Sequence, residues 1–201
     1  MKKLTIATIL ICFTFASQAQ QINSKGSIGI TYSGLGSNDA FHWQALDGAG
    51  SYTGKGFYSL GITYIRPISS RIDLETGIEY SHFKYRANSY PGPGAPEPYN
   101  FTDGLVSIPI TIRLNFLNYF FFNSGILVNV SASTDKGNTM DSQSGIGAMI
   151  GIGVKYDLKN APIGFFVNPF YKHHAILPFS MEKHHLRTDN AGFRFGVVYR
   201  L

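Results

Sequence analysis

Two pairs of adjacent histidines flank the last long connection of the chain. His173 lies beside His174, and His184 lies beside His185. Imidazole nitrogens are common ligands of zinc and copper, so these four side chains could hold a transition metal. No carboxylate or thiolate accompanies them at a fixed spacing, which favours a histidine-rich loop. We therefore expect no metal and no cofactor.

A serine and a histidine, the residue types of a nucleophile and its base, stand next to each other at Ser81 and His82. Adjacent side chains of a β-strand point to opposite faces, so these two cannot share a pocket if the segment is a strand. We expect no enzyme. A membrane-barrel enzyme acting on lipid or peptide stays open as an alternative, and it would need an acid, a base and a nucleophile to converge at one rim.

A set of charged residues lies on the polar faces of alternating segments: Asp73, Glu75, Glu79, Arg113, Lys155, Arg194 and Arg200. An ion buried without a partner is costly, so we expect these groups to pair across a narrow interior. Glu79 and Arg113 are the expected partners, because they lie on neighbouring strands. Asp73 and Arg200 lie near strand ends, where contact with periplasmic water is as good an explanation as pairing inside the barrel.

The elements that must position these groups are β-strands. The terminal stretch "NAGFRFGVVYRL" alternates bulky apolar residues with small or charged ones, which is the side-chain period of a strand. Eight such segments are expected, and the seventh is apolar on both faces, so its phase cannot be assigned. They span Ser27 to Leu35, Gly56 to Pro67, Arg71 to Arg86, Leu105 to Phe116, Tyr119 to Ser133, Ser144 to Asp157, Pro162 to His173 and Asn190 to Leu201.

The direction of the apolar faces separates two fold classes. A soluble lipocalin-like carrier turns them inward, and an outer-membrane barrel turns them toward lipid. Charged residues make up only 14% of the chain, too few to cover the outside of a soluble β-domain. The connections alternate long and short, as in outer-membrane barrels. We therefore predict an all-β fold: an eight-stranded antiparallel up-and-down transmembrane β-barrel, closed by pairing of the first and last strands.

Two details refine this barrel. Pro109 and Pro169 fall inside strands, and we expect β-bulges there because proline removes a ladder hydrogen bond. Outward tyrosines near strand ends are expected to form aromatic belts: Tyr32, Tyr58, Tyr64, Tyr80, Tyr156 and Tyr199.

The first 19 residues, "MKKLTIATILICFTFASQA", have two lysines, a short apolar run and small residues at the end, as secretory signal peptides do. We expect cleavage before Gln20, a barrel domain over 20–201, an outer-membrane location and periplasmic termini. Removal of Lys2 and Lys3 leaves 15 basic against 12 acidic residues. That mild excess, without a basic stripe, predicts no nucleic-acid partner.

The runs "VSIPITIRLNF", "SGIGAMIGIGVKYD" and "AGFRFGVVYRL" resemble the PorT-like outer-membrane β-barrel family of Bacteroidota (outer membrane protein beta-barrel domain). The resemblance covers the whole mature chain. It implies an outer-membrane barrel, and one relative in that family belongs to a secretion machinery. Members of the family are mostly of unknown function.

The expected function is that of a small non-enzymatic barrel with a plugged polar lumen, which presents loops for binding or supports envelope or secretion functions. Phe57, Phe83, Phe121 and Met149 fall on the expected inward faces and would fill the interior. The prolines of "YPGPGAPEPY" are expected to stiffen an exposed loop, which fits a recognition surface and a protease-resistant connector equally well. The candidate recognition residues are Trp43, Tyr90, Tyr99 and Phe101. The expected partners are outer-membrane lipid, the barrel assembly machinery through the C-terminal strand, and an unknown extracellular or envelope partner.

Overall fold

Eight antiparallel strands form one closed ring in a computed structural model of the protein. The structure describes residues 25–42, 51–88, 97–132, 141–180 and 185–201. Each strand pairs with its neighbour in sequence, and β1 also pairs with β8, so that Ser27 lies opposite Arg200. The strands are β1 (Ser27–His42), β2 (Ser51–Pro67), β3 (Ile72–Asn88), β4 (Tyr99–Phe116), β5 (Phe120–Ser131), β6 (Gly145–Asp157), β7 (Ile163–Pro178) and β8 (Leu186–Arg200).

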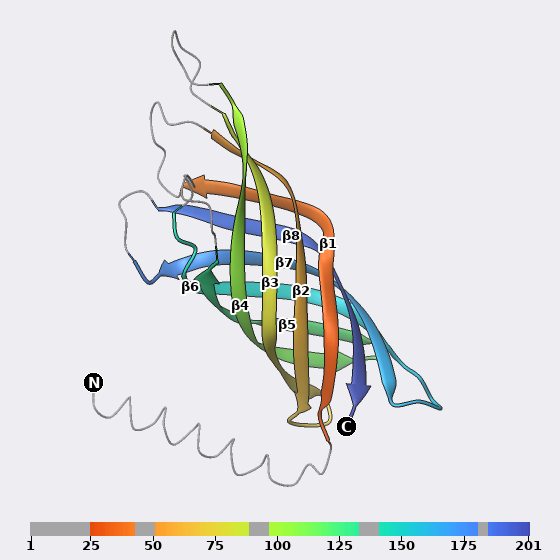
Figure 1. Ribbon diagram of the computed structural model, residues 1–201. Helices are drawn as coiled ribbons and strands as arrows, with labels where there is room; N and C mark the ends of the chain where they lie inside the picture. Colours follow the sequence, from red (N-terminus) through yellow and green to blue (C-terminus); the bar gives the residue numbers. More distant parts are fainter. Residues whose placement is uncertain (1–24, 43–50, 89–96, 133–140, 181–184) are drawn as a thin grey trace, which may run out of the picture.

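This architecture confirms the predicted fold class. In Figure 1, β1 to β4 cross the strands behind them at a steep angle, as expected for a closed barrel of tilted strands. The start of β1 and the end of β8 lie together at the lower end of the barrel (Figure 1). Short turns join β2 to β3, β4 to β5 and β6 to β7 at that same end, and the strand ends that precede and follow the longer connections are at the opposite end. Within the described residues, no helix is long and apolar enough to cross a membrane.

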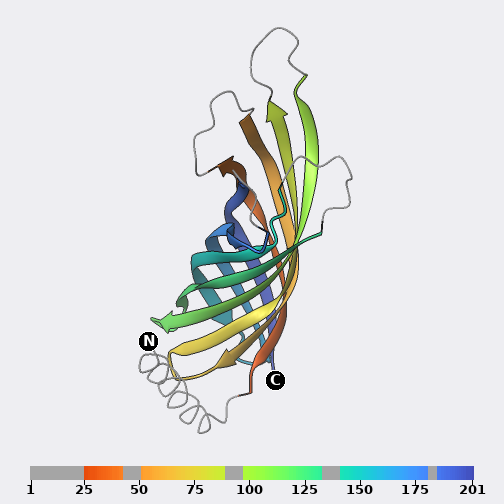
Figure 2. The same cartoon turned by 90° about the vertical axis from the view of Figure 1, so that its left-hand side faces the viewer.

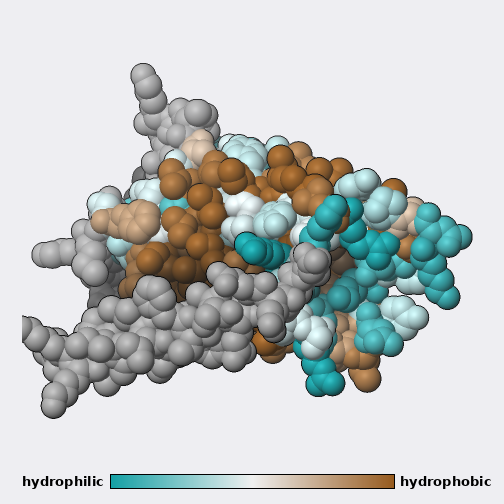
Figure 3. Space-filling view, turned by 90° about the horizontal axis from the view of Figure 1, so that it is seen from below, coloured by the Kyte–Doolittle hydropathy of each residue, from teal (hydrophilic) through white to brown (hydrophobic). Residues whose placement is uncertain are grey.

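The apolar faces of the strands point outward. Ile30 is 67% exposed and Ile62 is 60% exposed, whereas Ser33 and Ser59 on the opposite faces of the same strands are buried. The expected belt tyrosines are all exposed on the outer face. Apolar side chains also cover much of the outer surface seen from below, while hydrophilic ones gather at one margin (Figure 3). An apolar exterior contradicts the alternative of a soluble lipocalin-like carrier, which would need a wet outer face.

Several strands extend further than alternation predicts. β1 continues to His42, β2 begins at Ser51, β4 begins at Tyr99, and β8 begins at Leu186. These additions lie at the end of the barrel that carries the long connections, where β3 and β4 rise above the other strands (Figure 2). In this part the outer face is mostly polar and the inner face mixes apolar with polar residues, so the apolar-polar period of the wall is lost although the backbone ladder continues.

The prediction of β-bulges at the two prolines is wrong. Around Pro109 the pairing between β3 and β4 lapses at two positions, but the register is the same before and after the gap. Pro169 likewise leaves the β6–β7 register unchanged. A proline removes one N–H donor without adding a residue, so the ladder opens on one side and nothing is displaced.

The register shifts occur elsewhere, and each adds residues to one strand. They lie between Gly34 and Ser37, between Gly54 and Gly56, and between Ile146 and Ala148. Positive φ angles accompany them at Leu35, Gly56 and Ala175. All three are at the end of the barrel opposite the short turns, where bulges bend the strands and increase their twist.

Two aromatic rings enter the barrel where the facing residue is glycine. A Cβ added at Gly153 would lie 2.3 Å from the Phe121 ring, and one at Gly196 would lie 2.1 Å from the Phe166 ring. Both distances are far below van der Waals contact. The glycines of the inner face therefore make room for interior aromatic side chains.

Candidate functional site

The candidate site is the interior of the barrel, and its side chains form three layers along the axis. The layer near the short turns is apolar and consists of Ile65, Phe121, Phe166 and Val198. The layer near the long connections is also apolar and consists of Ala40, Phe83, Tyr85, Leu105 and Leu186, with Tyr52, Phe57 and Phe101 packed against it. Between them lies a layer of buried charged and amide side chains.

Glu75 is the centre of the first ionic cluster. It is fully buried on β3, and its Oε2 accepts hydrogen bonds from Arg113 Nε at 3.2 Å and Arg113 Nη2 at 2.9 Å. Arg194 of β8 lies on the other side, with its Nη2 2.9 Å from Glu75 Oε1. Thr63 also donates to Oε1, at 3.3 Å. One carboxylate therefore neutralises part of the charge of two buried guanidinium groups.

The two guanidinium groups also contact the apolar layer below them. Arg113 lies over the Phe121 ring at 4.0 Å and over the Phe166 ring at 4.9 Å. Arg194 lies 5.2 Å from the Phe166 ring. These cation–π contacts hold the cations of the ionic layer against the aromatic layer.

Glu79 is the centre of the second cluster. It forms an ion pair with Lys172 of β7 and accepts a hydrogen bond from Ser81 at 3.3 Å. Lys172 also lies 4.8 Å from the Phe170 ring. Since β3 and β7 are opposite each other in a ring of eight, this pair crosses the full width of the lumen.

The predicted partnership of Glu79 with Arg113 is therefore wrong. Arg113 pairs with Glu75, and Glu79 pairs with Lys172. Glu75 faces Thr111 in the β3–β4 register, two residues from Arg113, so the long arginine side chain reaches it diagonally. Glu79 lies four residues further along the strand, where the lysine of the opposite wall is its partner.

Sequence reasoning missed Lys172 because the phase of the seventh strand was not assigned. The structure buries Asn168, Lys172 and His174 on one face of β7 and exposes Tyr171 on the other. The polar residues at positions 168 and 172 share one phase of a period-two pattern, and that signal would have identified the inward face.

The remaining predicted charges lie at the end with the short turns. Asp73 accepts a hydrogen bond from Asn115 at 2.7 Å, and Lys155 donates to the same asparagine at 2.7 Å. Arg200 is exposed and donates to two turn carbonyls, those of Leu158 and Ala161. Arg200 is therefore outside the ionic layer, because its guanidinium binds the turn between β6 and β7.

Amide and imidazole groups complete the middle layer. Asn168 donates to Asn123 at 3.2 Å, Ser107 donates to Asn129 at 2.8 Å, and His174 Nε2 lies 2.9 Å from Asn190 Oδ1. All of these side chains except Ser107 and Asn190 are 0% exposed, and those two are 1% exposed.

The expected inward bulky residues Phe83, Phe121 and Met149 are buried, and Phe57 packs against Phe83 with ring centroids 6.0 Å apart.

At the upper end, Gln143 donates to the carbonyl of Leu186 at 2.7 Å and accepts from the Thr188 N–H. Tyr85 donates to Thr188 at 3.1 Å. These contacts cover the apolar layer from above.

The candidate chemical residues are separated by the strands. Ser81 is buried in the lumen beside Ser59, whereas the ring of His82 lies outside against Tyr58 at 5.2 Å. Likewise His174 points inward, and His173 pairs with Asp189 on the other face. Among the described residues, no group of three or more metal-ligating side chains gathers. Burial lowers the pKa of His185, which precedes β8. His184 lies outside the described residues.

The predicted recognition residues have different positions. Tyr99 is 44% exposed at the start of β4, whereas Phe101 is half-buried and stacks on Tyr85 at 5.4 Å. Phe101 therefore contributes to the upper apolar layer. Trp43 and Tyr90 lie outside the described residues, as does the proposed signal segment 1–19.

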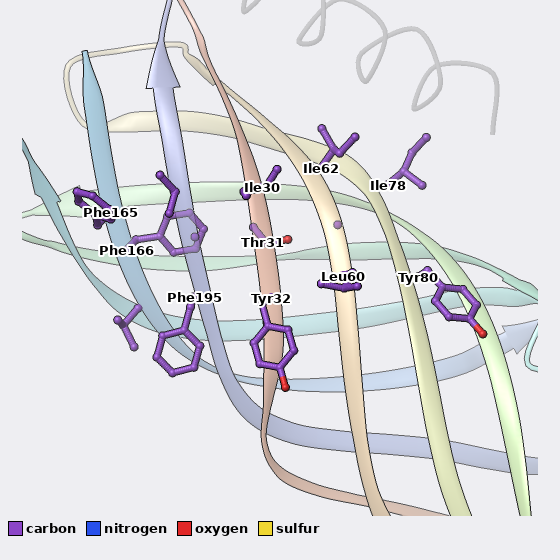
Figure 4. Close-up of a pocket in the computed structure, with 14 residues that line it drawn as sticks. Ile30, Thr31, Tyr32, Leu60, Ile62, Ile78, Tyr80, Phe165, Phe166 and Phe195 are labelled. Atoms are coloured by element: carbon purple, nitrogen blue, oxygen red, sulfur yellow. The ribbon is translucent and has the colours of Figure 1, made fainter. Parts of the chain in front are cut away.

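A large apolar groove of about 750 Å³ lies on the outer wall of the barrel. Side chains from β1, β2, β3, β7 and β8 line it, among them Ile30, Tyr32, Leu60 and Phe195 (Figure 4). Most of these apolar side chains belong to the outer face of the wall. The groove also reaches the buried Thr31 and Phe166, beside Gly61 and Gly196.

Comparison with known proteins supports the fold. No family model matches the sequence, and no curated protein matches it. The outer membrane protein AlkL, whose structure was solved in lipid bilayers, is similar with a TM-score of 0.54 and 11% identity over 89% of this chain and 91% of AlkL. OprG from Pseudomonas aeruginosa has a TM-score of 0.46 and 15% identity over 89% of this chain and 96% of its own. The translocator domain of the autotransporter NalP from Neisseria meningitidis has a TM-score of 0.38 and 9% identity over 100% of this chain and 98% of its own.

The likeness to AlkL and the closed ring of eight strands define the class of fold: a small β-barrel of the outer-membrane type. The chain shares that fold with AlkL, to which its sequence has little similarity.

Proposed function

We propose that this protein is a non-enzymatic outer-membrane barrel that acts as a scaffold with a closed, polar-cored lumen. The observation that carries the proposal is the pair of ionic links across the interior. Arg194 of β8 and Lys172 of β7 each reach a buried glutamate of β3, and apolar layers lie on both sides of them. Because these links and layers fill the lumen, we infer that the protein acts through the outer surface of the barrel and its longer connections.

The location follows from the exterior. A wall of exposed isoleucine, leucine, valine and aromatic side chains is stable only against hydrocarbon. We infer export through the N-terminal segment, insertion into the outer membrane, and termini on the periplasmic side with the short turns. Lipid is then the partner of the wall, and acyl chains would fill its apolar groove. The C-terminal strand would engage the assembly machinery, and the longer connections would meet an extracellular or envelope partner.

Membership of the PorT-like family of Bacteroidota is the finer proposal. It is supported by the runs "VSIPITIRLNF" and "AGFRFGVVYRL", which lie in the C-terminal parts of β4 and β8. A supporting role in the envelope or in secretion would follow from that membership.

Cell fractionation and heat modification test the proposal together. The mature chain is expected in the outer-membrane fraction and should migrate at different apparent sizes before and after boiling in detergent. Recovery in the soluble periplasm, with one band under both conditions, would reject it. An activity on lipid or peptide that disappears on changing His82 or His173 would instead support the enzyme alternative.

A further inference from the structure

Three cations gather on the outer face of β2 and β3, above the apolar wall. Lys84 and Arg86 are exposed because Phe83 and Tyr85, which alternate with them, are buried inside the barrel. Lys55 is the extra residue of the bulge between Gly54 and Gly56, and Gly56 pairs with Lys84. We call Lys55, Lys84 and Arg86 the basic cluster. The bulge thus brings a third cation beside two that the strand already presents.

The cluster lines a pocket. Its volume is about 370 Å³, and Asn100 and Thr102 of β4 form the side opposite the cations. The β3–β4 register places Thr102 opposite Lys84 and Asn100 opposite Arg86. The pocket therefore combines three cationic donors with an amide and a hydroxyl group, a set suited to an oxyanion.

The height of the cluster matches the edge of a membrane. The outward face of β3 carries Ile72, Leu74, Ile78 and Tyr80 in turn. At about 3.3 Å per residue and a tilt of about 40°, the ten steps from Ile72 to His82 rise about 25 Å, the height of the apolar band of such barrels. Lys84 and Arg86 follow directly, where lipid headgroups begin.

No ion pair in the described part of the chain includes any of these three cations. Of the four ion pairs found there, three are in the lumen and one joins His173 to Asp189. A lone exposed lysine is ordinary, but three unpaired cations around one pocket repel one another unless an anion joins them.

We propose that the basic cluster binds the phosphate groups of a lipid in the outer leaflet. The inference rests on the proposed outer-membrane location. Arg86 can hold two phosphate oxygens at once, and Lys55 and Lys84 add point charges from the bulge and from the same strand. The acyl chains of that lipid would run down the apolar wall below Tyr58 and Tyr80, so headgroup and tails would be bound by one face.

Binding of purified lipid tests the proposal. The full mature chain in a neutral detergent is titrated with diphosphoryl lipid A, with the monophosphoryl form, and with inorganic phosphate alone. Complexes are counted by native mass spectrometry. The variant Lys55→Gln/Lys84→Gln/Arg86→Gln removes the cluster. The matched control is Arg66→Gln/Arg71→Gln/Lys159→Gln, which removes three exposed cations near the opposite end.

The wild type and the control are expected to prefer the diphosphoryl lipid, and the cluster variant should bind it at least about 10-fold more weakly. Equal binding by all three proteins, or equal loss in the control, would overturn the proposal. So would displacement of the lipid by millimolar inorganic phosphate, which would make this a site for free phosphate. If the cluster variant keeps its heat shift and binds the lipid as well as the wild type does, the lipid site alone is rejected. If the wild type itself shows no heat shift, the proposed outer-membrane location is rejected.

Discussion

At the scale of single residues, Glu79 and Lys172 form a buried pair whose members depend on each other. Replacing one leaves the other charged, buried and without its partner, which costs about 3 to 5 kcal/mol in known buried pairs. We expect Glu79→Gln and Lys172→Met to lower the free energy of unfolding by more, when summed, than the double variant does. Urea unfolding of the refolded protein in lipid vesicles measures all three.

The pair Glu79→Gln and Arg113→Met is the control for this cycle, because these residues have different partners in the structure. Its coupling should be clearly smaller than that of Glu79 with Lys172. The opposite order would restore the partnership that the sequence alone indicated.

Glu75 should be the most sensitive carboxylate of the chain. It is fully buried between Arg113 and Arg194, so Glu75→Gln leaves two guanidinium groups facing each other without an anion. We expect a loss of at least about 3 kcal/mol in the free energy of unfolding, against about 0.5 kcal/mol or less for the exposed Glu97→Gln. Similar losses in the two variants would show that the ionic layer contributes little to stability.

At this scale the sequence predicted part of the inward set, without Lys172 and with the exposed Arg200, and it could not predict the pairing. Period-two alternation is a local property, so it places Glu75, Glu79 and Arg113 on one face of their strands. The partners Lys172 and Arg194 come from the opposite part of the ring. Their position depends on strand tilt and on the stagger at closure, neither of which is written in any single segment.

At the scale of elements, the stability of the barrel should depend on glycines that face phenylalanine rings of the neighbouring strand. A methyl group at Gly196 would lie 2.1 Å from the buried Phe166 ring, whereas one at Gly104 would lie no closer than 3.1 Å to any neighbour. We therefore expect Gly196→Ala to lower the free energy of unfolding by about 1 to 3 kcal/mol and Gly104→Ala to cost less. Urea unfolding compares them directly. An equal cost would mean that the Phe166 ring can move aside freely.

Strand number and outward faces were predictable because a membrane wall needs uninterrupted alternation. Strand ends were not, since above the membrane the outer face becomes polar while the inner face holds apolar residues among polar ones, and the pattern of the wall no longer marks a strand. The tight turn after β4 is an intermediate case. Because Phe116 pairs with Phe120, this turn has three residues, and two of them, Leu117 and Asn118, have positive φ angles. Only asparagine is a residue type that favours such angles.

At the scale of the whole molecule, the two ends of the barrel should face different compartments. A cysteine at Glu97, beside the start of β4, should react with an impermeant thiol reagent on intact cells. Cysteines at the short-turn residues Ser70 and Asn160, which are also exposed, should react only after the outer membrane is opened. The single native cysteine, Cys12, lies within the proposed signal segment. Labelling of Ser70→Cys or Asn160→Cys on intact cells, with Glu97→Cys silent, would reverse the orientation.

The last prediction concerns the closed lumen, which distinguishes a scaffold from a pore. Eight strands enclose only enough space for side chains, and here Phe83, Phe121 and the Glu75 cluster occupy successive levels of it. We expect the purified wild type to show no steady conductance of porin size in planar bilayers. A 16-stranded porin reconstituted in parallel is the positive control.

Steady openings of that size from the wild type would reject the closed lumen. The absence of conductance is informative when the wild type is compared with a variant that loses the second ionic cluster while the strands remain. Glu79→Ala/Lys172→Ala takes away the link between opposite walls, and brief openings in this variant alone would show that the pair is what keeps ions out. If both proteins stay silent and both keep the heat shift, the two apolar layers suffice to close the barrel, and binding partners must be sought at its rim and on its outer face.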